Sequence, residues 1–371
     1  LSGRFSIHMN RIIIVGGGAI GMLTALELVQ AGQAVTLFER ADTGRESSWA
    51  GGGIVSPLFP WRYLDSVTEL ASWSQAAYPA FCSQLAKDTG IDPEYTECGL
   101  ILVAPDEVVQ AQHWAEQHRR DLRPIDRAEF GRLEPRAANP ADQAIWMPRV
   151  AQVRNPRMVR ALRRRLEQLG VEIRTGAPVD GLLCPGDRCE GVRSADGAHH
   201  ADAVIVCAGA WSGDLLGELP SPPAIHPVRG QMLLFRAEPG TISRMVLEAN
   251  RYVIPRRDGR TLFGSTIEEA GFDKRITLAA REELYRIATT RFPVLGECEV
   301  EAHWAGLRPS SPAGVPYIGR HPGIDRLFVN AGHFRNGIVL GPASARLAAD
   351  LVLGRPPIVD PEPYGWTAAR G

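Results

Sequence analysis

The chain has 371 residues, with 41 basic and 42 acidic side chains and a net charge of −1. This length favours two domains, because single cores rarely grow beyond ~300 residues. The neutral balance argues against nucleic acid as a partner, and no apolar run is long enough for stable membrane insertion. The basic run at residues 163–165 is interpreted as a solvated helix face, since no aromatic residues are interleaved with it. Residues 1–8 precede Met9 and are expected to be a cloning remnant.

The six cysteines form no CxxC pair and no Cys/His cluster. Cys184 and Cys189 are close in sequence, but no second pair of ligands follows, so we predict no metal site. No signal peptide is visible after Met9, because the apolar run at residues 11–15 is too short and leads into glycines. Reduced thiols in a cytoplasmic protein are therefore the expected state.

The first elements form a βαβ unit. Residues 11–15 are a β-branched run and predict a buried strand, and residues 19–31 predict a helix that ends at Gly32. Residues 34–38 predict a second strand, which ends at Glu39. The crossover between two such parallel strands is expected to be right-handed.

Further along the chain, helices are predicted at residues 66–90, 157–169, 277–291 and 337–353. Strands are predicted at residues 171–174, 203–207, 231–236, 251–255, 261–265 and 326–330, whereas residues 104–150 are polar and less regular. The fold class is predicted to be α/β, with a Rossmann-like nucleotide-binding domain made of non-contiguous segments and an antiparallel-sheet α+β substrate domain. We assign residues 9–85, 150–220 and 300–366 to the first domain, and residues 86–149 and 221–299 to the second.

A glycine-rich turn follows the first strand. Residues 16–21 have the pattern G-x-G-x-x-G, and Glu39 stands about 20 residues further on, at the end of the second strand. In a dinucleotide fingerprint, Gly16 permits the turn, Gly18 lets the backbone approach the pyrophosphate, and Gly21 allows close helix packing. Glu39 accepts from ribose hydroxyls, which argues against a 2′-phosphorylated nucleotide. An ordinary glycine-rich turn is the alternative, and the fingerprint does not distinguish NAD from FAD.

Small residues recur where a cofactor needs room. Residues 46–55 are small, hydroxylic and rich in glycine, a composition that suits a pyrophosphate and a flat ring, although a flexible surface loop is the alternative. The turn at residues 208–209 follows the third strand of the predicted nucleotide domain. At residues 332–337 a tight turn is predicted to enter a helix, where a cofactor can approach the backbone.

Two arginines lie among apolar residues and glycines near the C-terminus. Arg308 belongs to residues 304–309, and Arg335 belongs to residues 332–342. A guanidinium in such a setting stays charged and needs an anion or a carbonyl as partner. Arg308 therefore predicts a carboxylate-binding site.

Taken together, these motifs resemble the D-amino-acid oxidase family of flavoproteins, and within it the glycine oxidases of bacterial thiamine biosynthesis. The resemblance covers about residues 9–353 and is carried by residues 16–21, 39–40, 47–53, 207–212, 304–309, 316–322 and 332–338. It implies an FAD cofactor. The FAD is expected to be non-covalent, because no cysteine lies near Arg308, where monomeric sarcosine oxidases attach their flavin.

The resemblance also implies which residues bind FAD. They lie in the first turn, at the end of the second strand, in the hydroxylic segment, beside the adenine, and in the loop that wraps the isoalloxazine. The set is Gly16, Gly18, Ala19, Ile20, Gly21, Glu39, Arg40, Ser47, Ser48, Gly52, Gly53, Ile54, Val179, Ala208, Gly209, Trp211, Gly332, His333, Phe334, Arg335, Asn336, Gly337, Ile338 and Val339.

For the substrate, the resemblance implies that Arg308 binds the carboxylate as a fork and that Tyr252 adds a hydroxyl hydrogen bond. Arg335 is placed beside both flavin and substrate. Asn250 and Ile267 are expected in the pocket wall, where relatives of the bacillus enzyme carry His and Met. The alternatives are a structural ion pair for Arg308, core packing for Tyr252, and a purely loop-holding role for Arg335.

The implied activity is FAD-dependent oxidative deamination of glycine and other small amines or D-amino acids in thiamine biosynthesis. Oxygen is the acceptor, and the products are glyoxylate or a 2-oxo acid, ammonia and hydrogen peroxide. The α-carbon loses a hydride, so no side chain is expected to act as a general base. The alternatives are a sarcosine oxidase, a D-amino-acid oxidase or dehydrogenase, and a non-catalytic or tRNA-modifying flavoprotein. A homo-oligomer, either dimer or tetramer, is left open.

Overall fold

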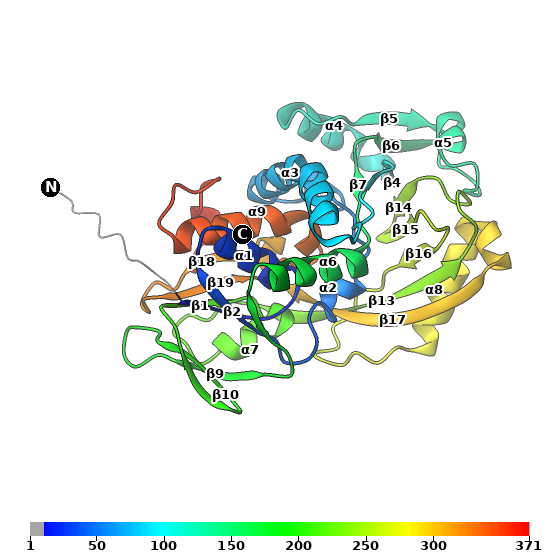
Figure 1. Ribbon diagram of the computed structural model, residues 1–371. Coiled ribbons are helices and arrows are strands. Elements are labelled where there is room, and N and C mark those ends of the chain that lie inside the picture. The colour runs from blue at the N-terminus through cyan, green and yellow to red at the C-terminus, as the bar shows by residue number, and fades with distance from the viewer. Residues whose placement is uncertain (1–10, 371) are drawn as a thin grey trace.

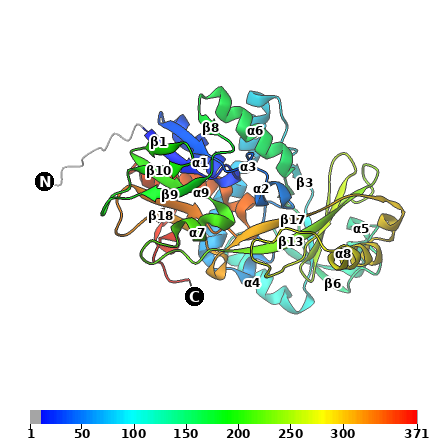
Figure 2. The same ribbon diagram turned by 90° about the horizontal axis from the view of Figure 1, so that it is seen from below.

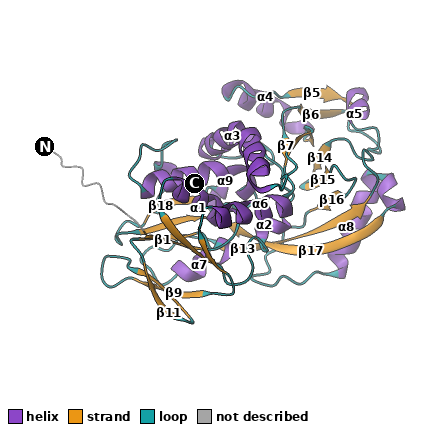
Figure 3. Ribbon diagram, viewed as in Figure 1, coloured by secondary structure: helices purple, strands orange, loops and turns teal. Residues whose placement is uncertain are grey.

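The structure is a computed structural model and describes residues 11–370. Figure 1 shows two large sheets toward opposite ends of the molecule, connected by the long strands β13 (His226–Arg236) and β17 (Glu299–Ser310). Figure 3, coloured by secondary structure, shows helices and strands in both parts of the molecule. The predicted remnant at residues 1–8 lies outside the described residues.

The first sheet has six strands in the order β18-β19-β12-β1-β2-β8, and β18 is the antiparallel edge of an otherwise parallel sheet. The five predicted strands are confirmed within one residue at each end, whereas β18 was not predicted. Their bounds are β1 (Arg11–Val15), β2 (Ala34–Phe38), β8 (Glu172–Arg174), β12 (Ala203–Val206), β18 (Tyr317–Arg320) and β19 (Leu327–Ala331).

Both faces of this sheet are buried. Ile12 and Ile14 pack into one core with four helices, α1 (Ala19–Gln30), α3 (Asp65–Thr89), α6 (Asn155–Gln168) and α9 (Gly337–Val352). Ile13 and Val15 point the opposite way, because successive side chains of a strand alternate. That face is covered by β9 (Val179–Leu183), β10 (Gly191–Ser194), β11 (Gly197–His200) and α7 (Ser212–Leu216), visible below the sheet in Figure 1.

The second sheet has eight strands in the order β17-β13-β16-β15-β14-β4-β6-β5, and all its pairs are antiparallel except β4 with β14. Leu100 and Leu102 pack toward α4 (Val108–Gln117), whereas Ile101 packs toward α8 (Leu278–Arg291). Figure 2 shows α8 on this sheet, far from the nucleotide-type sheet. The remaining strands are β4 (Leu100–Val103), β5 (Arg123–Asp126), β6 (Gln143–Met147), β14 (Met245–Glu248), β15 (Arg251–Pro255) and β16 (Thr261–Gly264).

The expectation of a less regular stretch at residues 104–150 is wrong. That stretch holds α4, β5, α5 (Arg127–Leu133) and β6, which are four to ten residues long. Elements this short carry few apolar positions each, and β6 becomes a strand by pairing with β4 and β5. Shorter elements complete the fold, namely α2 (Ser47–Ala50) and the paired strands β3 (Thr96–Glu97) and β7 (Ala151–Gln152).

The division into two domains at the predicted boundaries stays a prediction. What matters for the site is that β13 and β17 pair along almost their whole length, with Gly230 opposite Gly306 and Val228 opposite Arg308. This ribbon carries residues of the second sheet toward the glycine-rich turn of the first. No helix within residues 11–370 is long and apolar enough to cross a membrane.

Candidate active site

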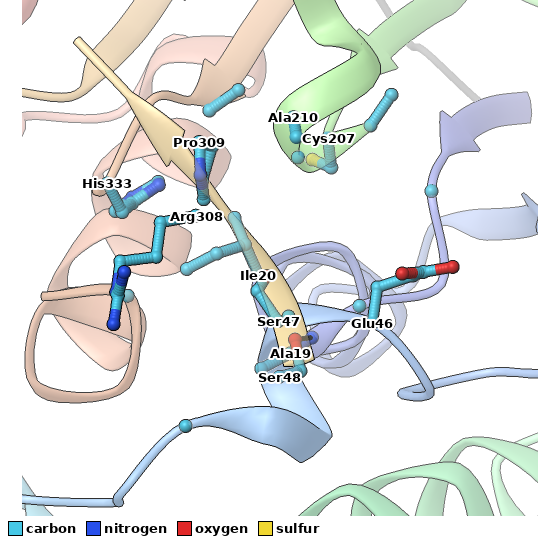
Figure 4. A pocket seen from close by; sticks show the side chains of 18 of the residues that line it. Ala19, Ile20, Glu46, Ser47, Ser48, Cys207, Ala210, Arg308, Pro309 and His333 are labelled. Atoms are coloured by element: carbon cyan, nitrogen blue, oxygen red, sulfur yellow. Dashed lines mark hydrogen bonds between the residues drawn. The ribbon is translucent and has the colours of Figure 1, made fainter. Parts of the chain in front are cut away.

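A cavity of about 460 Å³ extends from the carboxyl ends of β1 and β12 to the ribbon of β13 and β17. Most of the predicted cofactor residues line it, although they come from segments far apart in sequence. Five predicted site residues lie outside the lining, namely Gly21, Asn250, Ile267, Asn336 and Val339. Figure 4 shows how the walls are arranged, with Arg308 and His333 at one end, Glu46 at the other, and Ala19, Ser47 and Ser48 between them.

The turn after β1 is built on glycine for steric reasons. Gly16 has φ 115°, and a Cβ there would lie 2.3 Å from the carbonyl oxygen of Cys207. A Cβ on Gly21 would lie 1.9 Å from the carbonyl oxygen of Gly16. Gly21 therefore serves the close packing of α1, as its place in the fingerprint predicts, and this explains why it does not reach the cavity.

The N-terminus of α1 opens onto the cavity. Gly18 is the N-cap and lines the wall, and the backbone amide of Ala19 donates to Ser48 Oγ at 2.8 Å. The first amides of a helix have no intrahelical acceptor, and they carry the positive end of the helix dipole. Backbone amides, a hydroxyl and a residue without a side chain thus meet at one point, which suits a pyrophosphate.

At the end of β2, Glu39 is held by the backbone. Its Oε2 accepts from the amide of Gly17 at 2.8 Å, and its Oε1 accepts from the amide of Ala41 at 3.0 Å. The side chain is 9% exposed and makes no ion pair with any residue in 11–370. A fixed carboxylate with free lone pairs can accept from ribose hydroxyls, as the sequence predicts.

The loop before α9 forms the opposite end of the cavity. Gly332 has φ 82° and Phe334 has φ 47°, which turn the chain into the helix that begins at Gly337. His333 is buried beside Ser344 Oγ at 2.9 Å from its Nε2, and burial lowers the pKa of His333 to about 3. The imidazole is therefore neutral near pH 7. This loop therefore places backbone groups and the N-terminus of α9 at the cavity, and its imidazole, that of His333, carries no charge there.

Arg308 is the main cation of this end. It lies on β17, is partly buried, and donates to Ser265 Oγ at 2.7 Å and to the carbonyl oxygens of Arg229 and Thr266 at 3.2 Å. Burial lowers the pKa of its guanidinium, which nevertheless stays charged at neutral pH. No carboxylate within residues 11–370 forms an ion pair with it. The alternative of a structural ion pair is thus unsupported, and the cation still needs an anion.

Tyr252 lies beside this cation. Its side chain is 7% exposed and lines the cavity, and its hydroxyl donates to Ser265 Oγ at 3.2 Å. Ser265 is 1% exposed and accepts from both Arg308 and Tyr252. The two groups predicted to bind a carboxylate therefore converge on one buried hydroxyl.

Two further residues, which no motif in the sequence indicates, are needed here. Ser265 gives no signal in the sequence, because a serine after a strand glycine has no special meaning by itself. The second residue is Gly230 on β13. A Cβ on Gly230 would lie 2.1 Å from Arg308 Nη2, so this glycine makes room for the guanidinium above β13. A glycine inside a strand is the signal that could have indicated such close approach.

Arg335 also reaches the cavity. Its Nη1 donates to Asn250 Oδ1 at 3.2 Å, whereas its Nη2 is buried and finds no partner among the described residues. Asn250 thus holds Arg335 without lining the cavity itself. Ile267 is 44% exposed and does not form the pocket wall that the sequence predicts. Backbone pairing with β13 continues beyond Gly264, through the bridge between Arg229 and Glu268, and it leaves the side chain of Ile267 exposed.

The described residues fit an FAD. The glycine turn leaves open space that side chains would fill, Glu39 offers acceptors to a ribose, and the buried Arg335 Nη2 still lacks an acceptor. Among residues 11–370, Cys207 is the one thiol in the lining, and burial raises its pKa to about 12, so it stays protonated. That favours a non-covalent flavin.

A largely parallel sheet with a glycine-rich turn, an acid at the end of β2 and a long cavity define a dinucleotide-binding protein. The chain belongs to the DAO family of FAD-dependent oxidoreductases, whose family model matches residues 11–351. This confirms the predicted family and its cofactor, FAD.

Relatives and solved structures agree with this assignment. The chain is 49% identical over 355 residues to the glycine oxidase of Pseudomonas aeruginosa, covering 95% of this chain and 98% of that protein. It is 30% identical to the bifunctional protein ThiO/ThiG of Synechocystis, covering 92% of this chain and 51% of that protein. The crystal structure of glycine oxidase from Geobacillus kaustophilus matches with a TM-score of 0.92 at 29% identity, covering 98% and 100% of the two chains. The predicted fold class is confirmed.

Proposed function

We propose that this protein catalyses the oxidative deamination of glycine and other small amines or D-amino acids. The products are glyoxylate or a 2-oxo acid, ammonia and, with oxygen as acceptor, hydrogen peroxide. The observation that carries this proposal is Arg308, a cation on the wall of the FAD cavity that has no acidic partner within residues 11–370. The 49% identity to the Pseudomonas aeruginosa glycine oxidase supports glycine as the first substrate to test.

In this proposal Arg308 and Tyr252 bind the substrate carboxylate, and Arg335 adds a second positive charge at the same end. A charge-assisted fork fixes both the position and the orientation of a small substrate. When FAD is bound, it supplies the two-electron acceptor for the α-hydrogen and its electron pair. The residues of the chain bind and orient the substrate.

No side chain is assigned as a general base. His333 contacts Ser344 and is kept neutral by burial, while Glu39 is engaged by two backbone amides beyond the glycine turn. Glu46 lies at the end of the cavity away from Arg308 (Figure 4). This arrangement supports a reaction in which the substrate binds with a neutral amine. Its α-hydrogen is then transferred to the cofactor together with the electron pair of the C–H bond.

Anaerobic titration of the flavin absorbance with glycine, sarcosine, D-alanine and D-proline tests this function. Glycine should reduce the flavin and so bleach its absorbance. The amino acid that reduces the flavin fastest is the preferred substrate of the four. Oxygen uptake compared with dye reduction then separates an oxidase from a dehydrogenase. A flavin that no amino acid reduces would contradict the proposal and favour a non-catalytic or tRNA-modifying flavoprotein.

Ser265 is assigned a positioning role, because its hydroxyl accepts from both Arg308 and Tyr252. Ser265→Ala should lower kcat/KM for glycine roughly two- to tenfold, mainly through KM, since one buried hydrogen bond contributes about 0.5–1.5 kcal/mol. The flavin absorbance should be unchanged, and Ser265→Thr should restore part of the loss. Unchanged kinetics in the alanine variant would refute this role.

The setting of the activity is also part of the proposal. The relationship to a bifunctional protein named ThiO/ThiG supports a place in thiamine biosynthesis. The six cysteines are all free thiols, which supports a cytoplasmic location. Sedimentation of the holoenzyme would decide between a monomer and the dimer or tetramer left open by the sequence.

A further inference from the structure

A second cavity, of about 940 Å³, lies on the side of α2 opposite the FAD cavity. Its walls come from α6, residues 42–45, α2, the turn at residues 256–260, and the strands β13, β16 and β17. Figure 2 shows α6, α2, β13 and β17 meeting in this region. Ser48 faces the FAD cavity, whereas Trp49 faces the second cavity, and Gly51 contributes to both. The two cavities are thus separated by a single layer of chain.

The lining of this cavity is strongly basic, with seven arginines against three acids. Four of the arginines, Arg154, Arg157, Arg160 and Arg163, recur at every third residue along α6 and its N-cap. Adding Glu94 and Glu167, which pair with these arginines from outside the lining, still leaves seven cations and five acids. In a chain of net charge −1, this is a local concentration of positive charge.

Two of the cations lack an acidic partner within residues 11–370. Arg160 is exposed at the cavity and has no hydrogen bond or ion pair there. Arg256 is 7% exposed and donates to the carbonyl oxygens of Val153 and Gly52, both at 2.9 Å, and to Gln152. Burial lowers the pKa of Arg256 to about 10, so it stays positive at neutral pH. A buried charge of this kind is stabilised by an anion nearby.

Aromatic rings form part of the same lining. Trp49 and Trp304 are partly exposed and pack edge to face, with ring centroids 5.4 Å apart. Trp304 Nε1 donates to the carbonyl oxygen of Ala50 at 3.0 Å, which fixes that ring against α2. Guanidinium groups suit phosphate oxygens, and indole rings suit the faces of flat heterocycles.

We propose that this cavity is a binding site for an aromatic heterocycle that carries a phosphate or diphosphate group. The arginines of α6 bind the phosphate, and Trp49 with Trp304 contacts the ring. Nucleotides and phosphorylated coenzymes such as thiamine diphosphate share this chemistry. The proposal does not depend on glycine being the substrate of the FAD site.

Calorimetric titration of the FAD-saturated holoenzyme tests the site. The probes are ADP, thiamine diphosphate, inorganic pyrophosphate, and the unphosphorylated adenosine and thiamine. At least one phosphorylated heterocycle should bind roughly tenfold or more tightly than its unphosphorylated form and more tightly than pyrophosphate. Comparison of ADP with thiamine diphosphate identifies the source of the heterocycle. If no phosphorylated probe binds at millimolar concentration, or if pyrophosphate binds as tightly as both heterocycles, the proposal is wrong.

Two arginines of α6 offer a matched pair of variants. Arg160 lines the cavity, whereas Arg164 is also exposed on the same helix but lies outside the lining. Arg160→Glu should weaken binding roughly tenfold or more, and Arg164→Glu should leave it nearly unchanged. Trp49→Leu should reduce the affinity of the heterocycle to that of pyrophosphate. Equal losses in the two glutamate variants would mean nonspecific attraction and would overturn the site. Glycine turnover, measured in the same samples, reports separately on the FAD site.

Discussion

Replacing Arg308 by alanine should nearly abolish amino-acid turnover while the purified protein keeps its yellow flavin. Arg308 has no acidic partner within residues 11–370 and faces the cavity beside Tyr252. Losing one partner of a buried charged contact costs about 2–5 kcal/mol, which lowers kcat/KM roughly 30- to 5,000-fold. Steady-state kinetics with glycine, together with the flavin-to-protein absorbance ratio, measures both parts of the expectation.

The controls separate charge from shape. Arg308→Lys keeps the charge but loses the fork, so it should recover only part of the activity. Arg275→Ala, whose side chain is 88% exposed, should behave as the unmodified protein. Turnover that survives in Arg308→Ala would mean that another group binds the carboxylate. Loss of flavin from that variant would instead assign Arg308 to the architecture of the cavity.

The second large effect is expected at Gly18, where valine should give a folded protein that binds FAD more weakly and purifies with less of it. Gly18 has φ −73° and ψ −179°, an extended conformation that any residue adopts, so the backbone need not change. A Cβ there would lie 3.2 Å from Ser48 Oγ, and the branched side chain would fill the space proposed for the pyrophosphate. Overpacking of about 1–3 kcal/mol corresponds to roughly a 5- to 150-fold higher Kd for FAD.

Flavin absorbance after purification and titration of the apoprotein with FAD measure this change. Thermal unfolding of the apoprotein should be close to that of unmodified apoprotein, because the altered side chain faces a cavity. Gly131→Val is the matched control, since its Cβ would have no neighbour closer than 3.9 Å and lies far from the turn in sequence. Stoichiometric flavin with unchanged affinity in Gly18→Val would show that the pyrophosphate does not approach this turn.

Much of the nucleotide-type sheet could be predicted because its elements are locally encoded. Each of β1, α1 and β2 shows one secondary-structure pattern over its whole length. Gly16 and Gly21 lie where a Cβ would clash with a backbone carbonyl oxygen, so glycine is required at both positions. The edge strand β18 and the elements at residues 104–150 were missed. They are short, so each carries few apolar positions, and β18 and β6 become strands by pairing with β19 and β4.

The candidate site likewise contains residues that the sequence indicates and others that only the tertiary structure indicates. Arg308 was identified because a cation among glycines and apolar residues is conspicuous in sequence. Ser265 and Gly230 were not, because their importance arises from the distance to that guanidinium across the β13–β17 ribbon. Ile267, expected in the pocket wall, is 44% exposed and lies outside the lining of this cavity, because the pairing of its segment with β13 decides which side chains face the cavity.

The sequence by itself determined the dinucleotide turn, the acid at the end of β2, the family and the cofactor, because each depends on residues adjacent along the chain. The tertiary structure alone decided that Arg308 lacks an acidic partner within residues 11–370, that Tyr252 and Arg308 converge on one hydroxyl, and that the arginines of α6 line a cavity. The sequence favours a solvated face for residues 163–165, of which Arg163 lines this cavity. Pairing of charges and shaping of cavities depend on distances between segments far apart in the chain, and no local pattern encodes those distances.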